Sequence, residues 1–293
     1  MATKIGGIGL GIMGSAFSKN CLEAGLDVVG YDVDQGCLDR HTERGGTVVG
    51  SPADVTQQAD ICFSSLPKVV ALDSVVDDLV ANGKAGTVIL ETSTFPIDDK
   101  QRAHDRLAEA GIILLDCPIS GTGSQAETRD IMLYGSGDEA AFDSARPLVD
   151  AVAKNTKYIG PFGNGSKMKY VANLLVANHV ASAAEAMVVG IKGGLEPQMI
   201  YDVISESPAA VSAMFTVRGK LMVDRNYEPA QMKVEVWQKD ITVIGDFIKS
   251  IGADTPLFDA GCEMYRQAMD EGLALKDTAS VCTVVEKRSK LER

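Results

Sequence analysis

The sequence predicts an α/β fold, with a doubly wound, mainly parallel sheet in its N-terminal half and an all-helical domain in its C-terminal half. Short apolar segments alternate with helical ones from Lys4 to about residue 159, which is typical of parallel sheets covered on both faces. The alternation stops at a Gly- and Pro-rich segment, residues 160–165, and only helical periodicity follows. A chain of 293 residues can form two cores, so we expect domains at residues 1–163 and 164–293, with a long inter-domain helix.

The start of the chain has the pattern of a dinucleotide-binding turn. A predicted strand at residues 5–8 and a predicted helix at about 13–24 flank the fingerprint Gly9-Leu10-Gly11-Ile12-Met13-Gly14. Gly9 makes a tight turn, Gly11 lets the backbone approach a pyrophosphate, and Gly14 allows close packing of helix on strand. The free amides at this end of the helix, at Ile12 and Met13, would face the phosphates. The alternative is a structural βαβ unit in some other doubly wound protein.

An acidic residue, Asp32, ends the second predicted strand at residues 28–31. A carboxylate about twenty residues after the glycine turn accepts hydrogen bonds from both ribose hydroxyls of an adenosine. It would also repel the 2′-phosphate of NADP, and no Arg or Lys directly follows it. NAD is therefore the expected cofactor and NADP the less favoured one, although Arg40 or Arg44 reaching back would weaken this preference.

Further strands follow in the N-terminal half, at residues 47–49, 60–64, 87–90, 112–116, 131–134 and 156–159. Ligands of parallel sheets bind beyond the carboxyl ends of the strands. Besides the glycine turn, this rule selects three places: Leu66-Pro67, Ser93-Thr94 and the loop at residues 118–125.

Composition excludes several classes of function. The formal net charge is −12, whereas nucleic acids and anionic membranes attract basic proteins. The six cysteines show no CxxC pairing, so we expect buried thiols in a reducing cytoplasm, with no disulfide framework and no metal site. The longest apolar run, residues 171–191, contains Asn, His and Glu, which argues against a membrane span.

That run belongs to a long predicted helix, residues 166–191, which is apolar on nearly every side and is therefore expected to be buried all round, in part by a partner subunit. Lys169 and Asn173, four residues apart, share one face near its start. Either Lys169 extends into solvent from a protruding first turn, or it is an acid/base group beside a nicotinamide and a hydroxy acid. Periodicity alone favours neither interpretation.

A second candidate region is the loop Asp116-Cys117-Pro118-Ile119-Ser120-Gly121-Thr122-Gly123, which follows a predicted strand. Its backbone amides and two hydroxyls suit a carboxylate. Without other signals, a plain glycine loop between strands is the simpler interpretation.

Taken together, these motifs resemble the β-hydroxyacid dehydrogenases, which include 3-hydroxyisobutyrate dehydrogenase, tartronate semialdehyde reductase and 6-phosphogluconate dehydrogenase. The resemblance runs from end to end. It rests on the glycine turn with Asn20 and Gly25 behind it, Leu66-Pro67, Ser93-Thr94 with Pro96, Asp116 to Gly121, Gly163-Asn164-Gly165 leading to Lys169 and Asn173, and Lys239-Asp240. Several motifs in one order are far more specific than any single motif.

The resemblance implies a Rossmann-type domain and a helical domain that forms a homodimer or homotetramer. It implies that Lys169 is the catalytic acid/base and that Asn173 orients the substrate. Other implied roles are substrate carboxylate binding by Ser120, Gly121 and Thr122, and cofactor contacts from Leu66, Pro67, Thr94 and Lys239. From the sequence alone, Lys239 is equally a surface lysine paired with Asp240.

Departures from the family pattern lie around the substrate end. Thr122 and Arg129 stand where glycine is usual, Ala172 replaces an asparagine, and Met232 replaces an aromatic residue. The resemblance therefore supports the cofactor site better than it supports the identity of the substrate. Arg129, Lys167 and Arg218 are candidates for binding a second anionic group.

The sequence thus predicts a cytoplasmic, NAD-dependent oxidation of a small 3-hydroxy or 2-hydroxymethyl carboxylic acid. An alternative is an NAD(P)H-dependent reductase of glyoxylate, tartronate semialdehyde or succinic semialdehyde, which would keep every motif. Imine reductases share the scaffold, but they generally replace the lysine. In another class, the chain would be a non-catalytic dinucleotide-binding assembly protein.

Overall fold

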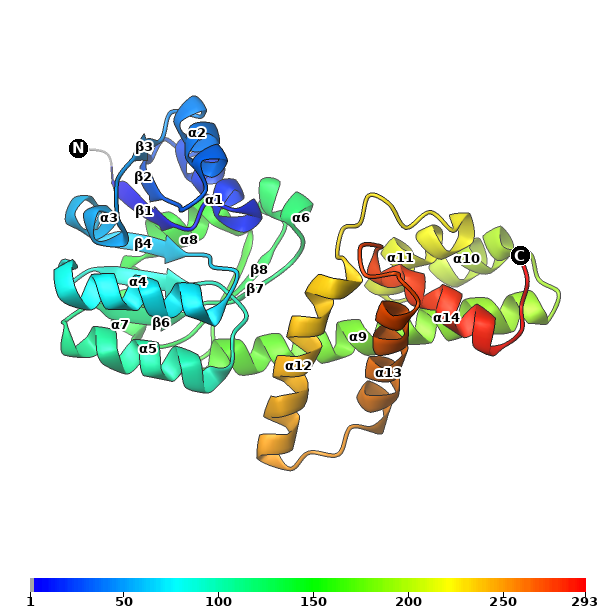
Figure 1. Cartoon of the computed structure of the whole chain (residues 1–293). Coiled ribbons are helices and arrows are strands. Elements are labelled where there is room, and N and C mark those ends of the chain that lie inside the picture. Colours follow the sequence, from blue (N-terminus) through cyan, green and yellow to red (C-terminus); the bar gives the residue numbers. More distant parts are fainter. Residues whose placement is uncertain (1–2) are drawn as a thin grey trace. The chain divides into compact units, whose positions relative to one another are not determined.

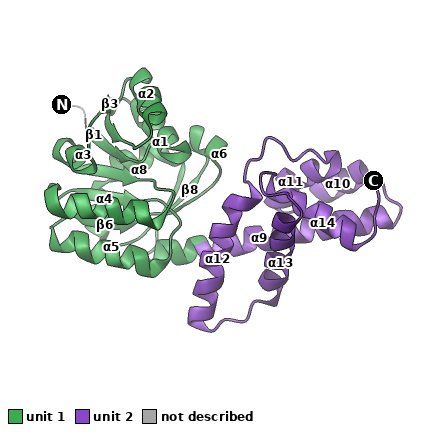
Figure 2. Ribbon diagram, in the orientation of Figure 1, with its two compact units in different colours: residues 1–169 green, residues 170–293 purple. Residues whose placement is uncertain are grey.

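The computed structural model describes residues 3–293, which form two compact units (Figures 1 and 2). The first unit ends at Lys169, and the second runs from Tyr170 to Arg293. One helix, α9 (Asn164–Lys192), begins in the first unit and continues into the second.

The first unit contains a six-stranded parallel sheet in the order β3-β2-β1-β4-β5-β6. The strand order reverses between β1 and β4, and such a switch point is where doubly wound sheets bind ligands. The predicted Rossmann-type fold is confirmed. The six strands are β1 (Lys4–Ile8), β2 (Asp27–Tyr31), β3 (Thr47–Val48), β4 (Ile61–Ser64), β5 (Val88–Glu91) and β6 (Ile113–Asp116).

Apolar side chains cover both faces of this sheet. One core cluster includes Phe17 and Phe63, whose ring centroids lie 5.6 Å apart in an edge-to-face arrangement. The other cluster includes Leu72 and Leu107, which come from two helices, residues 69–82 and 97–109, that lie side by side (Figure 1). Burial on both faces explains why the strands read as apolar runs. The helices after β1 to β5 are α1 (Ile12–Glu23), α2 (Gln35–Glu43), α3 (Pro52–Gln58), α4 (Val69–Asn82) and α5 (Ile97–Glu109).

A second, three-stranded sheet follows, in the order β7-β8-β9. The strands predicted at residues 131–134 and 156–159 form β8 (Met132–Gly135) and β9 (Asn155–Tyr158), but they do not join the six-stranded sheet. The strand β7 (Ile119–Ser120) was not predicted, because two residues are too short to show a period. The remaining helices of this unit are α6 (Gly123–Glu127), α7 (Glu139–Ser144) and α8 (Arg146–Val152).

The second unit is helical, and within residues 170–293 its only β pairing is one isolated bridge, between Lys233 and Asp277. Its core includes Trp237 and Tyr265, whose rings lie 6.2 Å apart. The helices after α9 are α10 (Pro197–Ser205), α11 (Ala213–Asp224), α12 (Val234–Ile251), α13 (Pro256–Asp270), the 3-10 helix η1 (Thr278–Ser280) and α14 (Val281–Arg288).

The chain's own residues leave one side of α9 uncovered, so its burial all round, in part by a partner subunit, stays a prediction. Met168, Val171 and Leu175, spaced three and four apart, are 42–52% exposed and form an apolar stripe on one side of the helix. Within the described residues, α9 alone is long and apolar enough to cross a membrane. Core helices of soluble proteins meet the same criterion, and α9 also holds buried Lys169 and Asn173, which lipid disfavours.

Candidate functional site

The three glycines of the turn differ in what requires them. Gly9 has φ +86°, and its N–H donates to the Tyr31 carbonyl oxygen at 2.9 Å. A Cβ on Gly14 would overlap the Gly9 carbonyl oxygen, so the protein's own packing excludes a larger residue there. Gly11 is exposed with φ −64°, and a Cβ on it would meet nothing within 4 Å. Its small size leaves an open approach to the backbone, as a dinucleotide pyrophosphate needs.

The N-terminus of α1 is suited to an anion. Gly11 is its N-cap, and no side chain caps the helix there. Its first residue, Ile12, is 79% exposed, and Met13 is half-buried. The first N–H groups of a helix lack intrahelical partners and carry its positive dipole end. This end therefore fits the pyrophosphate that the fingerprint predicts.

Asp32 lies beside that turn. Its two carboxylate oxygens accept hydrogen bonds from the backbone N–H of Leu10 at 2.6 Å and of Asp34 at 2.8 Å. The two nearby arginines have other partners: Arg44 donates to the Ser15 hydroxyl at 2.7 Å, and Arg40 to the Cys37 sulfur at 3.1 Å. Neither side chain neutralises Asp32 in this arrangement, which favours NAD over NADP.

The predicted cofactor loops after β4 and β5 are joined to each other. The Leu66 N–H donates to the Ser93 hydroxyl at 2.8 Å, and the Ser93 N–H donates to Glu91 Oε1 at 3.0 Å. Pro67 is exposed and Thr94 is half-buried. Leu66, Pro67 and Thr94 therefore belong to neighbouring loops at the carboxyl edge of the sheet.

The predicted carboxylate loop starts in β7, where Ser120 pairs with Met132 of β8. Gly121 has φ +146°, and a Cβ there would contact the Ile131 side chain. Thr122 caps α6: its N–H donates to Gln125 Oε1 at 2.9 Å, and its hydroxyl accepts from the Gln125 N–H at 3.4 Å. Ser120 and Gly121 are therefore better placed than Thr122 to donate to a carboxylate.

Two contacts link the cofactor helix α1 to this loop. The Asn20 amide donates to the Ala126 carbonyl oxygen at 2.8 Å, and Lys19 Nζ lies 2.9 Å from Glu127 Oε2. The first contact is buried and the second is partly exposed. They fix α6, and with it the end of the carboxylate loop, against α1.

The first turn of α9 is held by a buried carboxylate. Asp116 accepts the Ser166 N–H at 2.7 Å and the Ser166 hydroxyl at 2.8 Å. Lys169 follows one turn later and is only 8% exposed. This burial argues against the interpretation in which Lys169 extends into solvent.

In the second unit, Asn173 is 4% exposed, and its amide donates to Asp240 Oδ2 at 3.1 Å. Lys239 is exposed, with its Nζ 3.7 Å from Asp240 Oδ1. This ion pair is the arrangement expected of a surface lysine. The role of Lys239 toward a cofactor stays a prediction.

The three candidates for a second anion site have different surroundings. Arg218 is buried, with its Nε 3.0 Å from Asp277 Oδ1, so its charge is already paired. Lys167 and Arg129 are exposed, and Arg129 has φ +61°. This left-handed backbone explains why glycine suits the Arg129 position.

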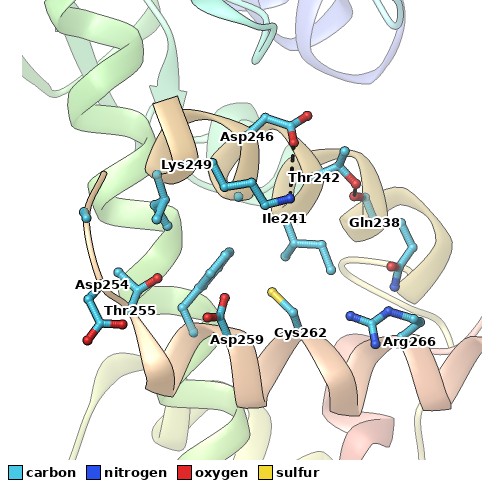
Figure 3. Close-up of a pocket in the computed structure, with 14 residues that line it drawn as sticks. Gln238, Ile241, Thr242, Asp246, Lys249, Asp254, Thr255, Asp259, Cys262 and Arg266 are labelled. Carbon is cyan, nitrogen blue, oxygen red and sulfur yellow. Dashed lines mark hydrogen bonds and ion pairs between the residues drawn. The ribbon is translucent and has the colours of Figure 1, made fainter. Parts of the chain in front are cut away.

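A cavity of about 340 Å³ lies between α12 and α13, inside the second unit (Figure 3). Gln238, Thr242, Cys262 and Arg266 are among its lining residues, and Lys249 pairs with Asp246 at 3.8 Å. None of the predicted site residues lines it. Within residues 3–293, no cluster of three or more His, Cys, Asp or Glu side chains could hold a metal ion.

Sequence reasoning missed two features near the site. Val33 is 89% exposed directly after Asp32, so an apolar side chain stands open to solvent beside the predicted ribose-binding residue. Lys100 is fully buried, and the missed signal was its spacing from Ala103 and Leu107 on the core-facing side of α5.

Two family models together match most of the chain. Residues 4–160 match the NAD-binding domain of 6-phosphogluconate dehydrogenase, and residues 163–285 match the NAD-binding domain of NADP-dependent 3-hydroxyisobutyrate dehydrogenase.

Similar proteins cover nearly the whole chain. An L-threonate dehydrogenase of Pectobacterium atrosepticum is 31% identical over 94% of this chain and 92% of its own. Glyoxylate/succinic semialdehyde reductase 2 of Arabidopsis thaliana is 29% identical, over 94% of this chain and 78% of its own. The solved 3-hydroxyisobutyrate dehydrogenase of Mycobacterium tuberculosis, with L-serine, is 25% identical, with TM-score 0.88 over 97% of this chain and 99% of its own.

Proposed function

Because the chain belongs to the β-hydroxyacid dehydrogenase family, we propose that it uses NAD to oxidise the hydroxyl group of a small 3-hydroxy or 2-hydroxymethyl carboxylic acid. The family makes the protein an oxidoreductase. The buried lysine at the start of α9, beside the carboxyl edge of the sheet, is the observation that carries the reaction type. Burying an amine is costly, and acid/base chemistry would account for the burial of Lys169.

The residues of the first unit support a binding mode for NAD. The N-terminus of α1 at Gly11 would hold the pyrophosphate, and Asp32 would accept the ribose hydroxyls. Leu66, Pro67, Thr94 and, from the other unit, Lys239 would complete the contacts. When bound, NAD supplies a hydride acceptor, and the protein supplies binding, orientation and proton transfer.

Lys169 is proposed as the general base in oxidation and the general acid in reduction. In oxidation, its amine takes the hydroxyl proton while the C–H bond breaks and the C=O bond forms. Ser120 and Gly121 would hold the substrate carboxylate, and Asn173, kept in place by Asp240, would orient the substrate. The balanced products are an aldehyde or ketone acid, NADH and one proton.

The relatives suggest which acids to test. The decisive experiment is a screen of L-threonate, L-serine, 3-hydroxyisobutyrate and related hydroxy acids for NADH formation at 340 nm. NADH formation with at least one acid, and little with NADP, is the expected result. No turnover with any acid, together with tight NADH binding, would favour the assembly-protein alternative.

A reductase of glyoxylate or succinic semialdehyde is the second candidate, because the Arabidopsis relative carries that name. It uses the same residues in the opposite direction. Comparing kcat/KM for aldehyde reduction with that for hydroxy acid oxidation distinguishes the two.

We also propose residues 1–163 as the cofactor-binding domain, residues 164–293 as the substrate and dimerisation domain, and a cytoplasmic homodimer or homotetramer. The exposed stripe of Met168, Val171 and Leu175 supports self-association, since exposed apolar patches mark interfaces. Light scattering coupled to size-exclusion chromatography tests the assembly. A monomer at micromolar concentration would contradict it.

A further inference from the structure

A lysine that the proposed function does not use lies between two strand ends of the first unit. Lys100 on α5 is fully buried, with its Nζ 2.7 Å from Glu91 Oε2 and 2.8 Å from Asp116 Oδ1. Both carboxylates are also fully buried. Burying charges is unfavourable unless they are paired and hydrogen-bonded, so this cluster of three demands a reason.

Each carboxylate supports a different part of the candidate site. Glu91 accepts the Ser93 N–H, and the Ser93 hydroxyl accepts the Leu66 N–H. Asp116 accepts the N–H and the hydroxyl of Ser166 in α9. Lys100 therefore joins the predicted cofactor loops to the start of the helix that carries the proposed acid/base.

The contacts of Asp116 with Ser166 lie in the first turn of α9. The first N–H groups of a helix have no intrahelical partner, and a carboxylate stabilises this end. The Gly165 N–H is held as well, at 2.9 Å from the hydroxyl of Ser136, which lies 3.0 Å from the Asp116 carbonyl oxygen and 3.3 Å from Asp116 Oδ2. Lys169 lies one turn further on, so a shift of this first turn moves its amine.

We propose that Lys100 is a positioning residue: by joining Glu91 to Asp116, it fixes Lys169 relative to the loops of Leu66 and Ser93. This inference rests on the proposed function, because the position of Lys169 affects turnover only if the chain is that enzyme. A displacement of about 1 Å in such a group lowers turnover by about 100-fold.

Lys100 remains a cation in this cluster. Burial alone lowers its pKa, but Asp116 and Glu91 outweigh that effect, and the pKa of Lys100 is raised above its ordinary value. Cys117 also lies beside the cluster, and burial raises the pKa of its thiol, which therefore stays neutral. The ion pairs of Lys100 with Glu91 and Asp116 are thus expected to persist over the pH range in which the protein is active.

The test uses two variants of the whole chain. Lys100→Met leaves two buried carboxylates facing each other, so one should bind a proton, and its stability deficit should shrink as the pH is lowered from 8 to about 5.5. In Lys100→Met/Glu91→Gln one negative charge is also removed, while the glutamine oxygen can still accept from Ser93. We expect this double variant to melt near the wild-type temperature and to bind NADH within about threefold, yet to lose about 100-fold in kcat.

A surface ion pair offers the matched control. Lys84 Nζ lies 2.6 Å from Asp60 Oδ1 with both side chains exposed, so Lys84→Met should leave stability, NADH binding and kcat unchanged. If the double variant keeps kcat within about twofold of the wild type, Lys100 serves charge balance alone and the proposal is overturned.

Hydrogen exchange separates this proposal from the proposed function. The amides of Leu66 and Ser166 should exchange faster in the double variant than in the wild type or in Lys84→Met, whether or not a substrate has been found. Unchanged exchange at both amides would overturn the link through Lys100. A wild-type chain that oxidises no hydroxy acid would instead overturn the proposed function.

Discussion

The carboxylate of Asp32 accepts a hydrogen bond from the backbone N–H of Leu10, with 2.6 Å between nitrogen and oxygen. The residue proposed to bind the ribose therefore also holds the glycine turn. A second oxygen of the same carboxylate accepts the Asp34 N–H. Any variant of Asp32 tests both roles, so the substitution must preserve the turn.

Asp32→Asn keeps an oxygen for the Leu10 N–H and removes the charge. Hydrogen bonds to a charged group contribute about 1.5–3 kcal/mol, so the dissociation constant of NADH should rise about 10- to 100-fold. NADPH should be affected less, because the repulsion of its 2′-phosphate is removed as well. Fluorescence titration with both cofactors measures this. Equal weakening of the two would mean that Asp32 acts on the turn alone.

Gly11→Ala and Gly14→Ala form a matched pair within the turn. Nothing lies within 4 Å of a Cβ on Gly11, so Gly11→Ala should fold normally and lose NADH affinity. Gly14→Ala should lower the free energy of unfolding by about 3 kcal/mol or more, because its Cβ meets the Gly9 backbone. Gly245 in α12 also has nothing within 4 Å of an added Cβ, so Gly245→Ala should raise the free energy of unfolding by about 1 kcal/mol. Normal NADH binding by Gly11→Ala would contradict the pyrophosphate site.

Lys169→Ala should lower kcat by about 10²- to 10⁴-fold, because it removes the proposed general acid/base. NADH binding should stay nearly unchanged. Lys192→Ala, at the other end of the same helix, is the control: its exposed amine donates to the Ser289 carbonyl oxygen and lies outside the proposed site. Retained turnover in folded Lys169→Ala would rule out the assignment.

His41 makes the stability of the first unit depend on pH. Its ring is buried, with Nδ1 2.8 Å from the Ser18 hydroxyl and Nε2 3.2 Å from the Thr47 carbonyl oxygen. Burial lowers the pKa of His41 below its usual value of about 6.5. The folded state therefore favours the neutral ring, and this contribution to stability is lost as the pH falls below about 6.5.

Chemical denaturation at pH 7.5 and 5.5 tests this dependence. The free energy of unfolding of the wild type should fall by up to about 1.4 kcal/mol per pH unit from this residue. His41→Gln should be less stable than the wild type at pH 7.5, but its free energy of unfolding should fall less between pH 7.5 and 5.5. A decrease as large as in the wild type would assign the pH dependence to other groups.

Arg129→Gly should stabilise the protein. The left-handed conformation costs a non-glycine residue about 1–2 kcal/mol, and the added freedom of glycine in the unfolded chain costs about 0.5–1 kcal/mol. A net gain of about 0.5 kcal/mol in the free energy of unfolding follows. Arg225 has a similar φ of +51° but forms an ion pair with Glu286, so Arg225→Gly should gain less. A loss of stability in Arg129→Gly would reveal a structural role for that side chain.

Sequence periodicity was sufficient for elements whose burial is one-sided or complete. The strands β1, β2, β4, β5 and β6 were predicted because each is a short run of buried, mainly apolar residues. The placement of β8 and β9 in a separate sheet was not predictable, since strand pairing depends on contacts between distant residues. Ile119–Ser120 became a strand only through its pairing with β8.

The residues of the candidate site likewise fall into those that the sequence identified and those that it did not. Gly9, Gly11, Gly14 and Asp32 were identified because their spacing along the chain encodes one local turn. The Lys100 cluster was not identified, because Glu91, Lys100 and Asp116 come from three separate elements and meet only in the folded chain. The exposure of Met168 on α9 was not predicted either, since composition alone does not reveal which apolar side the chain leaves uncovered.

The side chain of Arg44 has a consequence for cofactor redesign. Its guanidinium donates to both the hydroxyl and the carbonyl oxygen of Ser15, so this candidate for binding a 2′-phosphate is already engaged. Removing the carboxylate of Asp32 would remove the repulsion of the NADP 2′-phosphate but would not provide a cation that binds it. A switch of preference therefore requires two changes, one that deletes a repulsion and one that frees a cation.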